Sequence, residues 1–324
     1  MKTVFIVNPK AGRGKKFRKT MNEIHQFCKL DAFDAECYIT KAPQDASRFV
    51  KDYCAMFGPA RFIACGGDGT LNEVLNGAMG CEGAEVGVVP IGTGNDFRRN
   101  FKTGTDFYNL ESQVLSSCVR CDAVRYRLMS GGKETIGYCA NMFNIGFDCA
   151  VADFTGTVKE KTFFSGTAAY VVSIFVALLK KETYCMDVAI DGNEVYSGKL
   201  LLTSIANGKY CGGGLKTNPV ATVDSGLLNI NMVKNLSRRR LLSILPSYCN
   251  GSYINRTDLA DIVSTKNGAC VTVIPHTGRM RISVDGEIVS ASRAEFTIVP
   301  RGFAFVVPMA SAQKTHQEEI SIDI

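Results

Sequence analysis

The first third of the chain alternates short apolar runs with segments of helical periodicity, and this pattern restricts the fold more than any other feature. The predicted strands are Thr3–Asn8, Ala35–Thr40, Arg61–Cys65 and Val86–Pro90, and the predicted helices are Phe17–Leu30, Ala46–Met56 and Leu71–Ala78. Such alternation is typical of parallel strands joined by helical crossovers that cover both faces of a sheet. We therefore predict an α/β domain with a parallel sheet.

After about Asp122 the pattern changes, because strand-like stretches follow one another with few helices between them. The predicted strands are Ile136–Ile145, Tyr184–Ile190, Glu194–Ile205, Leu227–Val233, Ala269–Ile274 and Met280–Val284, and the helices are Thr167–Lys180 and Arg238–Tyr248. Asp191-Gly192-Asn193 is a hairpin turn signal between two of these strands. A chain of 324 residues is long enough for two domains. We predict an α/β domain over residues 1–125 and an all-β, sandwich-like domain over residues 126–302.

Glycine-rich loops follow three of the predicted strands of the first domain. They are Asn8-Pro9-Lys10-Ala11-Gly12, Gly66-Gly67-Asp68-Gly69-Thr70 and Pro90-Ile91-Gly92-Thr93-Gly94-Asn95-Asp96-Phe97. In a parallel sheet such loops emerge at one edge, where ligands bind, so they can converge. Their glycines let the backbone approach phosphate oxygens, and Thr70 can cap a helix whose N-terminus favours anions. The loops therefore suggest a phosphate-binding edge.

Asp68 is the one acid in the second loop. Its charge would repel a phosphate unless a cation lies between them, which suggests a magnesium-bridged nucleotide. On the residues alone, a glycine-rich turn without function is an equally good interpretation. None of the loops matches G-x-x-x-x-G-K-[ST], and none shows G-x-G-x-x-G after a strand, which argues against a P-loop protein and a dehydrogenase.

Taken in order, these motifs resemble those of the diacylglycerol kinase catalytic-domain superfamily, in its soluble bacterial branch. The third loop distinguishes this superfamily from the NAD kinases, which are similar at Gly66–Gly69 but do not continue into Gly-Thr-Gly-Asn-Asp-Phe. The later matching motifs are Asn72-Glu73, Asn144-Ile145-Gly146-Phe147-Asp148, Asn207-Gly208 with Gly212-Gly213-Gly214, Pro219-Val220-Ala221, Gly226-Leu227-Leu228 and Val284-Asp285-Gly286-Glu287. The resemblance implies an ATP- and Mg²⁺-dependent lipid kinase with its active site in the cleft between two domains. It also implies that residues 303–324 return to the first domain.

The resemblance assigns roles to particular residues. ATP would bind to Asn8, Pro9, Lys10, Ala11, Gly12, Thr40, Gly66, Gly67, Asp68, Gly69, Thr70, Leu71, Asn72 and Thr93. Asp68 would act on the catalytic Mg²⁺ through water, with Asp122 as a second acid in that network. Glu287 would be the general base that takes the proton from the lipid hydroxyl. Without the resemblance, Asp-Gly-Glu between two strands is an ordinary hairpin turn. Lys15 and Lys161 could supply cations near the γ-phosphate.

One position departs from the family pattern. The family often carries an acid directly before the glycine of the Gly-Leu motif, where it binds a structural magnesium with nearby backbone carbonyls. Here that position is Ser225, with Asp224 one place earlier, and strand alternation would point Asp224 the other way. The expected ligands are Ser225 and the carbonyls of Thr222 and Leu227. Whether this metal site survives stays open.

Composition bears on where the chain works. Its 13 cysteines have no repeated C-x-x-C framework, and the one close pair, Cys118 and Cys121, lacks the second pair and the nearby histidines of a zinc site, which suggests a reducing, cytoplasmic environment. The longest apolar stretch, Gly166–Leu179, is shorter than the roughly 20 residues that span a bilayer. A net charge of +6 and the run Arg238-Arg239-Arg240 fit peripheral binding to an anionic membrane, although a solvated helix start explains the arginines equally well. We expect a lipid partner and no nucleic acid, and leave a homodimer open.

Diacylglycerol is the expected acceptor, and phosphatidic acid the product. A kinase for a sphingoid base, ceramide or another lipid alcohol would keep the same ATP motifs, because the lipid pocket has no residue code that we can read. A non-catalytic nucleotide-binding regulator on the same fold is the alternative from another class. The presence of both Asp68 and Glu287 argues against it, since a pure binder has no use for a general base.

Overall fold

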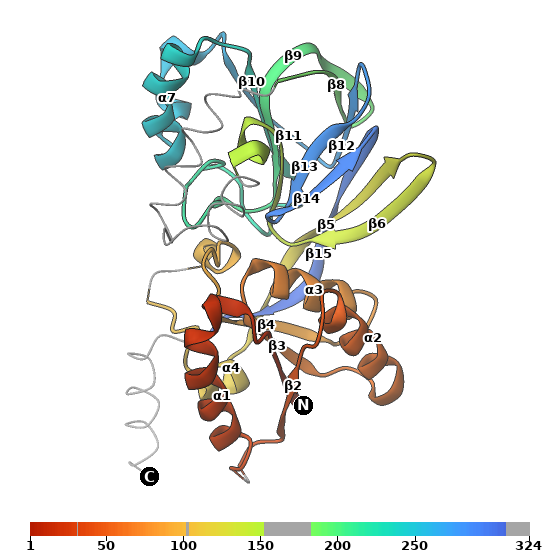
Figure 1. Ribbon diagram of the computed structural model, residues 1–324, viewed down its shortest axis with the longest axis vertical. Helices are drawn as coiled ribbons and strands as arrows, with labels where there is room; N and C mark the ends of the chain where they lie inside the picture. Colours follow the sequence, from red (N-terminus) through yellow and green to blue (C-terminus); the bar gives the residue numbers. More distant parts are fainter. Residues whose placement is uncertain (31, 102–103, 152–182, 309–324) are drawn as a thin grey trace, which may run out of the picture. The chain divides into compact units, whose positions relative to one another are not determined.

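The computed structural model describes residues 1–30, 32–101, 104–151 and 183–308 (Figure 1). Lys161 and the predicted helix Thr167–Lys180 lie outside the described residues. The chain forms two compact units, the first from Met1–Cys121 and the described residues from Gly302 onward, the second from Asp122–Arg301. The backbone passes from one unit to the other within strands β5 (Cys118–Ser130) and β15 (Arg293–Val306).

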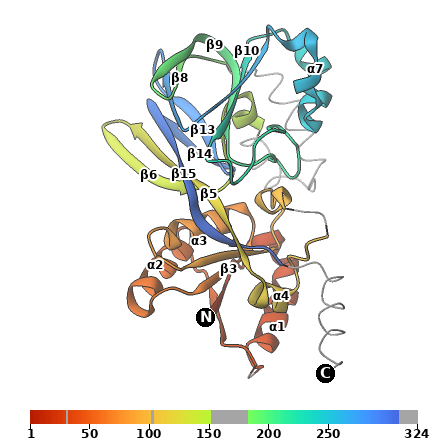
Figure 2. The same cartoon turned by 180° about the vertical axis from the view of Figure 1, so that it is seen from behind.

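The first unit is a parallel sheet with helices on both faces (Figures 1 and 2). Its elements are β1 (Thr3–Val7), α1 (Lys15–Phe27), β2 (Ala35–Ile39), α2 (Asp45–Phe57), β3 (Arg61–Gly66), α3 (Asp68–Ala78), β4 (Glu85–Pro90), α4 (Leu110–Leu115) and the end of β15, with 3-10 turns at Ala11–Gly14 and Phe97–Asn100. The order across the sheet is β2-β1-β3-β4-β15, and neighbouring strands run parallel. The predicted alternation of strands and helices is confirmed.

Burial on both faces explains the unbroken apolar runs of these strands. On one face the ring of Phe5 meets Phe27 of α1 edge-on, with ring centroids 5.9 Å apart. On the other face Phe62 meets Tyr53 of α2 at 5.5 Å. Successive side chains of a strand point to opposite faces, so a strand covered twice needs apolar residues at every position.

The last residues of β15 complete this unit. Ala304 and Phe305 pair with the start of β4 in parallel register. The ring of Phe305 lies 5.0 Å from that of Phe97, 4.9 Å from Phe101 and 6.2 Å from Phe107, so it closes an aromatic cluster directly after the third glycine-rich loop.

The second unit is an antiparallel sheet that curls around an apolar core. Its remaining elements are β6 (Lys133–Cys139), β7 (Met142–Gly146), β8 (Tyr184–Ile190), β9 (Asn193–Ala206), β10 (Leu228–Lys234), α7 (Arg238–Asn250), β11 (Val263–Gly268), β12 (Cys270–Pro275), β13 (Met280–Val284) and β14 (Glu287–Ala291). The order is β14-β13-β7-β9-β8-β12-β15, with β10 and β11 attached at β9 and β6 joined through β5 to β15. Strands β9, β8 and β12 separate β7 from β15, yet the rings of Phe143 and Phe296 are 4.4 Å apart. The sheet therefore folds back on itself as a sandwich does.

The second unit also corrects some expectations. The predicted strand Ile136–Ile145 is two strands, because the chain turns at Ala140 and Asn141, where the Asn141 carbonyl accepts from the backbone N–H of Asn207. Strands β5, β11 and β14, and the part of β15 before Phe303, were not predicted. The Asp191-Gly192 hairpin joins β8 and β9 as predicted, with positive φ at both residues (49° and 81°).

Candidate active site

Three loops at the carboxyl edge of the first unit's sheet lie in contact. The loop after β1 begins at Asn8, whose backbone N–H donates to the Cys65 carbonyl at 3.0 Å and whose Nδ2 donates to Thr70 Oγ1 at 3.1 Å. The loop after β4 joins from the other side, where the Gly92 N–H donates to the Gly66 carbonyl at 2.9 Å. The structure thus brings together the three loops that were expected to converge.

Glycine is required where two of these loops touch. A Cβ atom at Gly92 would lie 2.3 Å from the Cα of Gly67, closer than any side chain tolerates. The start of α3 differs from the prediction that Thr70 caps it. The helix begins at Asp68 with Gly67 as its N-cap, so Thr70 lies inside the first turn, and its hydroxyl accepts from Asn8 instead.

The carboxylate of Asp68 is held by the loop after β4. Its Oδ1 accepts hydrogen bonds from the backbone N–H groups of Asp96 at 2.7 Å and Phe97 at 3.4 Å. Burial raises the pKa of Asp68 above its ordinary value, while these N–H groups act in the opposite direction. Its Oδ2 lies 2.7 Å from the point where a Gly94 side chain would begin. Glycine at 94 leaves the room that this carboxylate occupies.

No role was predicted for Asp96 from the sequence. It is buried, and its Oδ1 lies 3.5 Å from Nε of Arg99. Its Oδ2 lies 3.4 Å from the same Gly94 position that Asp68 approaches. Two carboxylates therefore flank Gly94, and such oxygen ligands fit Mg²⁺. The sequence shows that the third loop contains this acid, but only the fold shows that Asp96 lies beside Asp68.

The other predicted nucleotide residues lie around these loops. Lys10 and Thr93 are exposed, and Thr40 follows β2, with its N–H donating to the Val7 carbonyl at 3.0 Å. Leu71 is buried in α3, so only its backbone could face a nucleotide. The remaining predicted positions are Pro9, Ala11 and Gly12 in the first loop, Gly66, Gly67 and Gly69 in the second, and Asn72 in α3. Lys15 opens α1, and its side chain is not among those described.

Glu287 belongs to the second unit, where it is the first residue of β14 and is exposed. It pairs with Val284 across the Asp285-Gly286 turn, whose φ angles are 45° and 98°. Asp285 anchors the hairpin, because its Oδ1 accepts from the Met142 N–H at 3.0 Å and its own N–H donates to the Met142 carbonyl at 3.2 Å. The two acids therefore differ: Asp285 holds the turn, and Glu287 is exposed at the start of β14.

The residues of the predicted structural metal site lie in one turn of the second unit. Residues 222–227 form turns before β10 rather than a strand, so the alternation argument for Asp224 does not apply. Ser225 Oγ lies within hydrogen-bond distance of both expected carbonyl ligands, those of Thr222 and Leu227. Asp122 accepts from the backbone N–H groups of Gly226 at 2.6 Å and Arg301 at 2.7 Å, all within the second unit. Among the residues described, no group of three or more His, Cys, Asp or Glu side chains could hold a metal.

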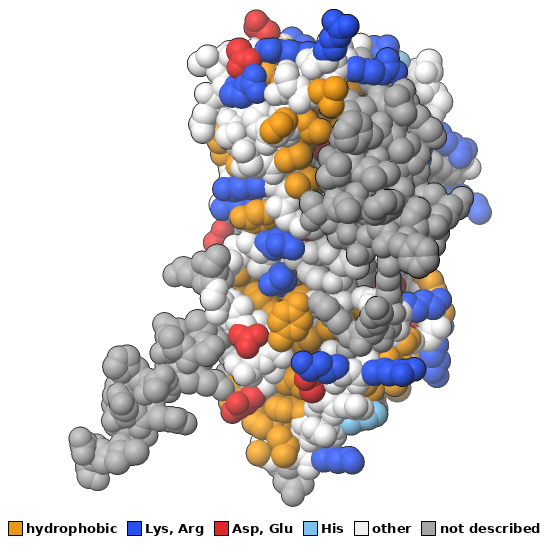
Figure 3. All heavy atoms as spheres, turned by 60° about the vertical axis from the view of Figure 1, so that its left-hand side comes forward, with side chains coloured by type: hydrophobic (Ala, Val, Ile, Leu, Met, Phe, Trp, Pro, Cys, Tyr) orange, Lys and Arg blue, Asp and Glu red, His pale blue; other side chains and the backbone are white. Residues whose placement is uncertain are grey.

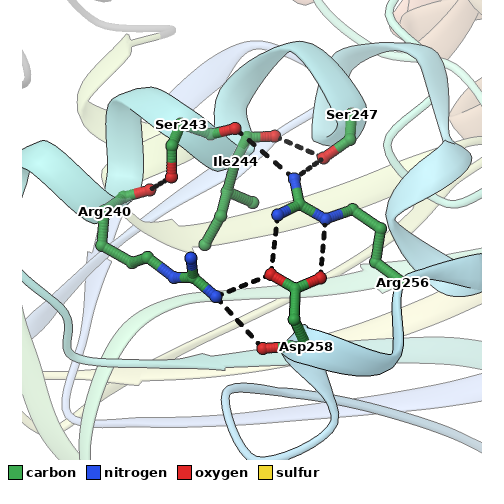
Figure 4. A network of polar contacts seen from close by, with 6 residues as sticks. All are labelled: Arg240, Ser243, Ile244, Ser247, Arg256 and Asp258. Atoms are coloured by element: carbon green, nitrogen blue, oxygen red, sulfur yellow. Dashed lines mark hydrogen bonds and ion pairs between the residues drawn. The ribbon is translucent and has the colours of Figure 1, made fainter.

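A surface of basic and apolar side chains lies at α7. Arg240 pairs with Asp258 at 2.7 Å, and Arg256 pairs with the same carboxylate at 2.8 Å (Figure 4). Arg238 and Arg239 are exposed at the start of the helix, and Figure 3 shows apolar side chains on this face with Lys and Arg side chains beside them. The exposed apolar residues here include Leu242 and Ile254.

Comparisons with known proteins support both units. The family model described as "Diacylglycerol kinase catalytic domain" matches residues 2–126, and "YegS C-terminal NAD kinase beta sandwich-like domain" matches residues 141–307. "Lipid kinase YegS" of Escherichia coli strain K12 is 27% identical over 275 residues, which cover 83% of this chain and 85% of that protein.

Two solved structures show the same fold. A diacylglycerol kinase from Bacillus anthracis str. Sterne matches with a TM-score of 0.65 and 19% identity, over 94% of this chain and 96% of that one. Yeast NADH kinase complexed with NADH matches with a TM-score of 0.52 and 11% identity, over 100% of this chain and 89% of that one. The predicted combination of an α/β domain and a sandwich-like β domain is confirmed. The chain belongs to the YegS-like lipid kinases of the diacylglycerol kinase catalytic-domain superfamily.

Proposed function

We propose that the chain transfers the γ-phosphate of ATP to the hydroxyl group of diacylglycerol and so forms phosphatidic acid. The observation that carries the proposal is the contact of three glycine-rich loops around Asp68, whose carboxylate is fixed by the Asp96 N–H at 2.7 Å. Membership of a lipid kinase family supplies the reaction class and implies ATP as the phosphate donor.

The first unit would bind the nucleotide. Backbone N–H groups at the start of α3 and in the glycine-rich loops can bind phosphate oxygens, and the positive end of the helix dipole favours them. Asp68 and Asp96 would hold Mg²⁺ between themselves and the nucleotide. When bound, the ion supplies neutralisation of the phosphate charge, which accounts for much of the catalysis of phosphoryl transfer.

Glu287 would supply the base. The lipid hydroxyl oxygen forms a bond to the γ-phosphorus, the bond from that phosphorus to the bridging oxygen of ADP breaks, and the hydroxyl proton passes to the Glu287 carboxylate. An exposed carboxylate can take this proton without loss of the hairpin, because Asp285 holds the turn against β7.

The acceptor lies in a bilayer, so the proposal includes peripheral docking on an anionic membrane. Arg239 would contact acidic headgroups, and Leu242 and Ile254 would enter the interface. Arg240 contributes less, because Asp258 already neutralises it. No described helix combines the length and the apolar character that crossing a membrane demands.

The test is a phosphorylation assay with the purified chain, radiolabelled ATP and Mg²⁺. Mixed micelles would contain diacylglycerol, a sphingoid base, ceramide or monoacylglycerol, and Asp68→Asn serves as the blank. We expect label in phosphatidic acid. Label in a different lipid phosphate would replace diacylglycerol as the substrate. ATP binding without label in any lipid would contradict the proposal and favour a non-catalytic nucleotide-binding regulator.

A further inference from the structure

The turn of residues 222–227 lies where the second unit begins and ends. Asp122 and Arg301 are the first and last residues of that unit. The N–H of Asp122 donates to the Val223 carbonyl at 2.6 Å, and the Asp122 carboxylate accepts from Gly226 and Arg301. The turn thus fastens β5 to β15 at the points where both strands leave the unit.

The hydroxyl of Ser225 closes this turn from within. Its Oγ lies 3.2 Å from the Thr222 carbonyl oxygen and 3.1 Å from that of Leu227, so its single proton can be donated to either. The oxygen also accepts from the Leu227 N–H at 3.3 Å, and the Ser225 N–H donates to Thr222 at 3.4 Å. The hydroxyl and the backbone N–H of the serine are thus both engaged inside the turn.

This arrangement does not fit the magnesium ion that the family resemblance implies. Mg²⁺ requires oxygen ligands at about 2.0–2.1 Å in near-octahedral geometry and binds carboxylates in preference to neutral groups. Here a neutral hydroxyl stands at the position of the acid, and it can donate its one proton to either of the two carbonyls. Within the described turn, the Ser225 hydroxyl is bonded to backbone groups and the Asp122 carboxylate accepts from Gly226 and Arg301, so no carboxylate stands between the two carbonyls.

We propose that the Ser225 hydroxyl takes the place of a cation in this turn, so that residues 222–227 keep their conformation without bound metal. Two carbonyl oxygens that converge on one point repel each other, and a positive group between them relieves the repulsion. The hydroxyl proton is such a group. This inference is independent of the reaction that the chain catalyses.

The experiment measures thermal unfolding without nucleotide, in EDTA and in about 5 mM Mg²⁺, because an ion that binds only the folded chain raises the unfolding midpoint. Wild type and Ser225→Ala should respond to Mg²⁺ to the same extent, because any binding at Asp68 and Asp96 is common to both. Ser225→Ala should unfold about 2–4 °C lower in both solutions, because it loses the bridging proton. Ser225→Asp should be less stable than wild type in EDTA and should gain more stability from Mg²⁺ than wild type does, since a carboxylate completes the cation site. Ser252→Asp adds the same charge at an exposed serine outside the turn and should respond to Mg²⁺ no more than wild type does.

A Mg²⁺-dependent rise of the wild-type midpoint that Ser225→Ala abolishes would overturn the proposal. A rise that persists in Ser225→Ala arises elsewhere in the chain and supports it. A Ser225→Asp variant that gains no more from Mg²⁺ than wild type does would show that the turn lacks the geometry of a cation site, and would also overturn it. If Ser225→Ala does not fold, Ser225→Thr, which keeps the hydroxyl, must fold and respond to Mg²⁺ as wild type does. Because every measurement is of stability, failure of this proposal is distinguishable from failure to phosphorylate diacylglycerol.

Discussion

Replacing Glu287 with Gln separates catalysis from binding. Glutamine keeps the size of the side chain but cannot accept the hydroxyl proton, and a general base contributes roughly 10²–10⁴-fold to rate, which equals about 3–5 kcal/mol of barrier. The side chain is exposed at the start of β14, so the free energy of unfolding should change by less than about 0.5 kcal/mol. The glycine-rich loops belong to the other unit, so ATP affinity should change by less than about threefold.

The assay measures initial rates of lipid phosphorylation at saturating ATP and nucleotide affinity on the same purified protein. Glu194→Gln is the matched control, because Glu194 is also exposed and follows an Asp-Gly hairpin turn in the same unit. It should retain wild-type activity. Loss of ATP binding in step with activity would mean that Glu287 is structural. Unchanged activity would refute its role as base, and Asp285 would be tested next.

Three further predictions concern charge. Asp68→Asn should fold, because its remaining oxygen can still accept from the loop after β4, but turnover should fall by at least about 10³-fold; wild-type activity would contradict the Mg²⁺ role. Arg239→Glu should weaken binding to anionic vesicles, measured by co-sedimentation at low salt, by about ten- to thirtyfold, whereas the control Lys51→Glu on α2 should not. Binding that resists high salt would contradict the electrostatic account. Burial raises the pKa of Asp148 to about 6, with the Tyr248 hydroxyl donating to it at 2.7 Å. The folded chain therefore holds this proton more tightly than the unfolded chain, and stability falls as the pH rises. In urea unfolding, wild type should lose on the order of 3 kcal/mol relative to Asp148→Asn between about pH 4 and pH 7, and parallel profiles would refute this.

The first unit was predictable because its strands are covered on both faces. Strands β1, β3 and β4 read as continuous apolar runs, and each of these three runs ends at a glycine-rich loop. The parallel topology then places the loops at one edge. The approach of Asp96 to Asp68 could not be predicted from the sequence, because it depends on how the loop after β4 folds over the start of α3.

The second unit was harder to predict because several of its strands lack a strong burial pattern. β11 reads Val-Ser-Thr-Lys-Asn-Gly and pairs only with β10 in the described sheet, so it has little apolar surface to reveal it. β14 is likewise an outer strand with exposed residues. The role of Ser225 could not be predicted either, because a serine carries no sign of which carbonyls its turn brings together.

The aromatic cluster closed by Phe305 has a consequence for synthesis on the ribosome. Phe97 and its loop are made early, but the ring that buries Phe97 follows roughly 200 residues later, or about 10–40 s at ordinary rates of translation. During that interval β4 lacks its parallel neighbour, and Phe97, Phe101 and Phe107 lack their partner. The third glycine-rich loop is therefore made early, but the aromatic cluster that follows it is among the last parts of the protein to be finished.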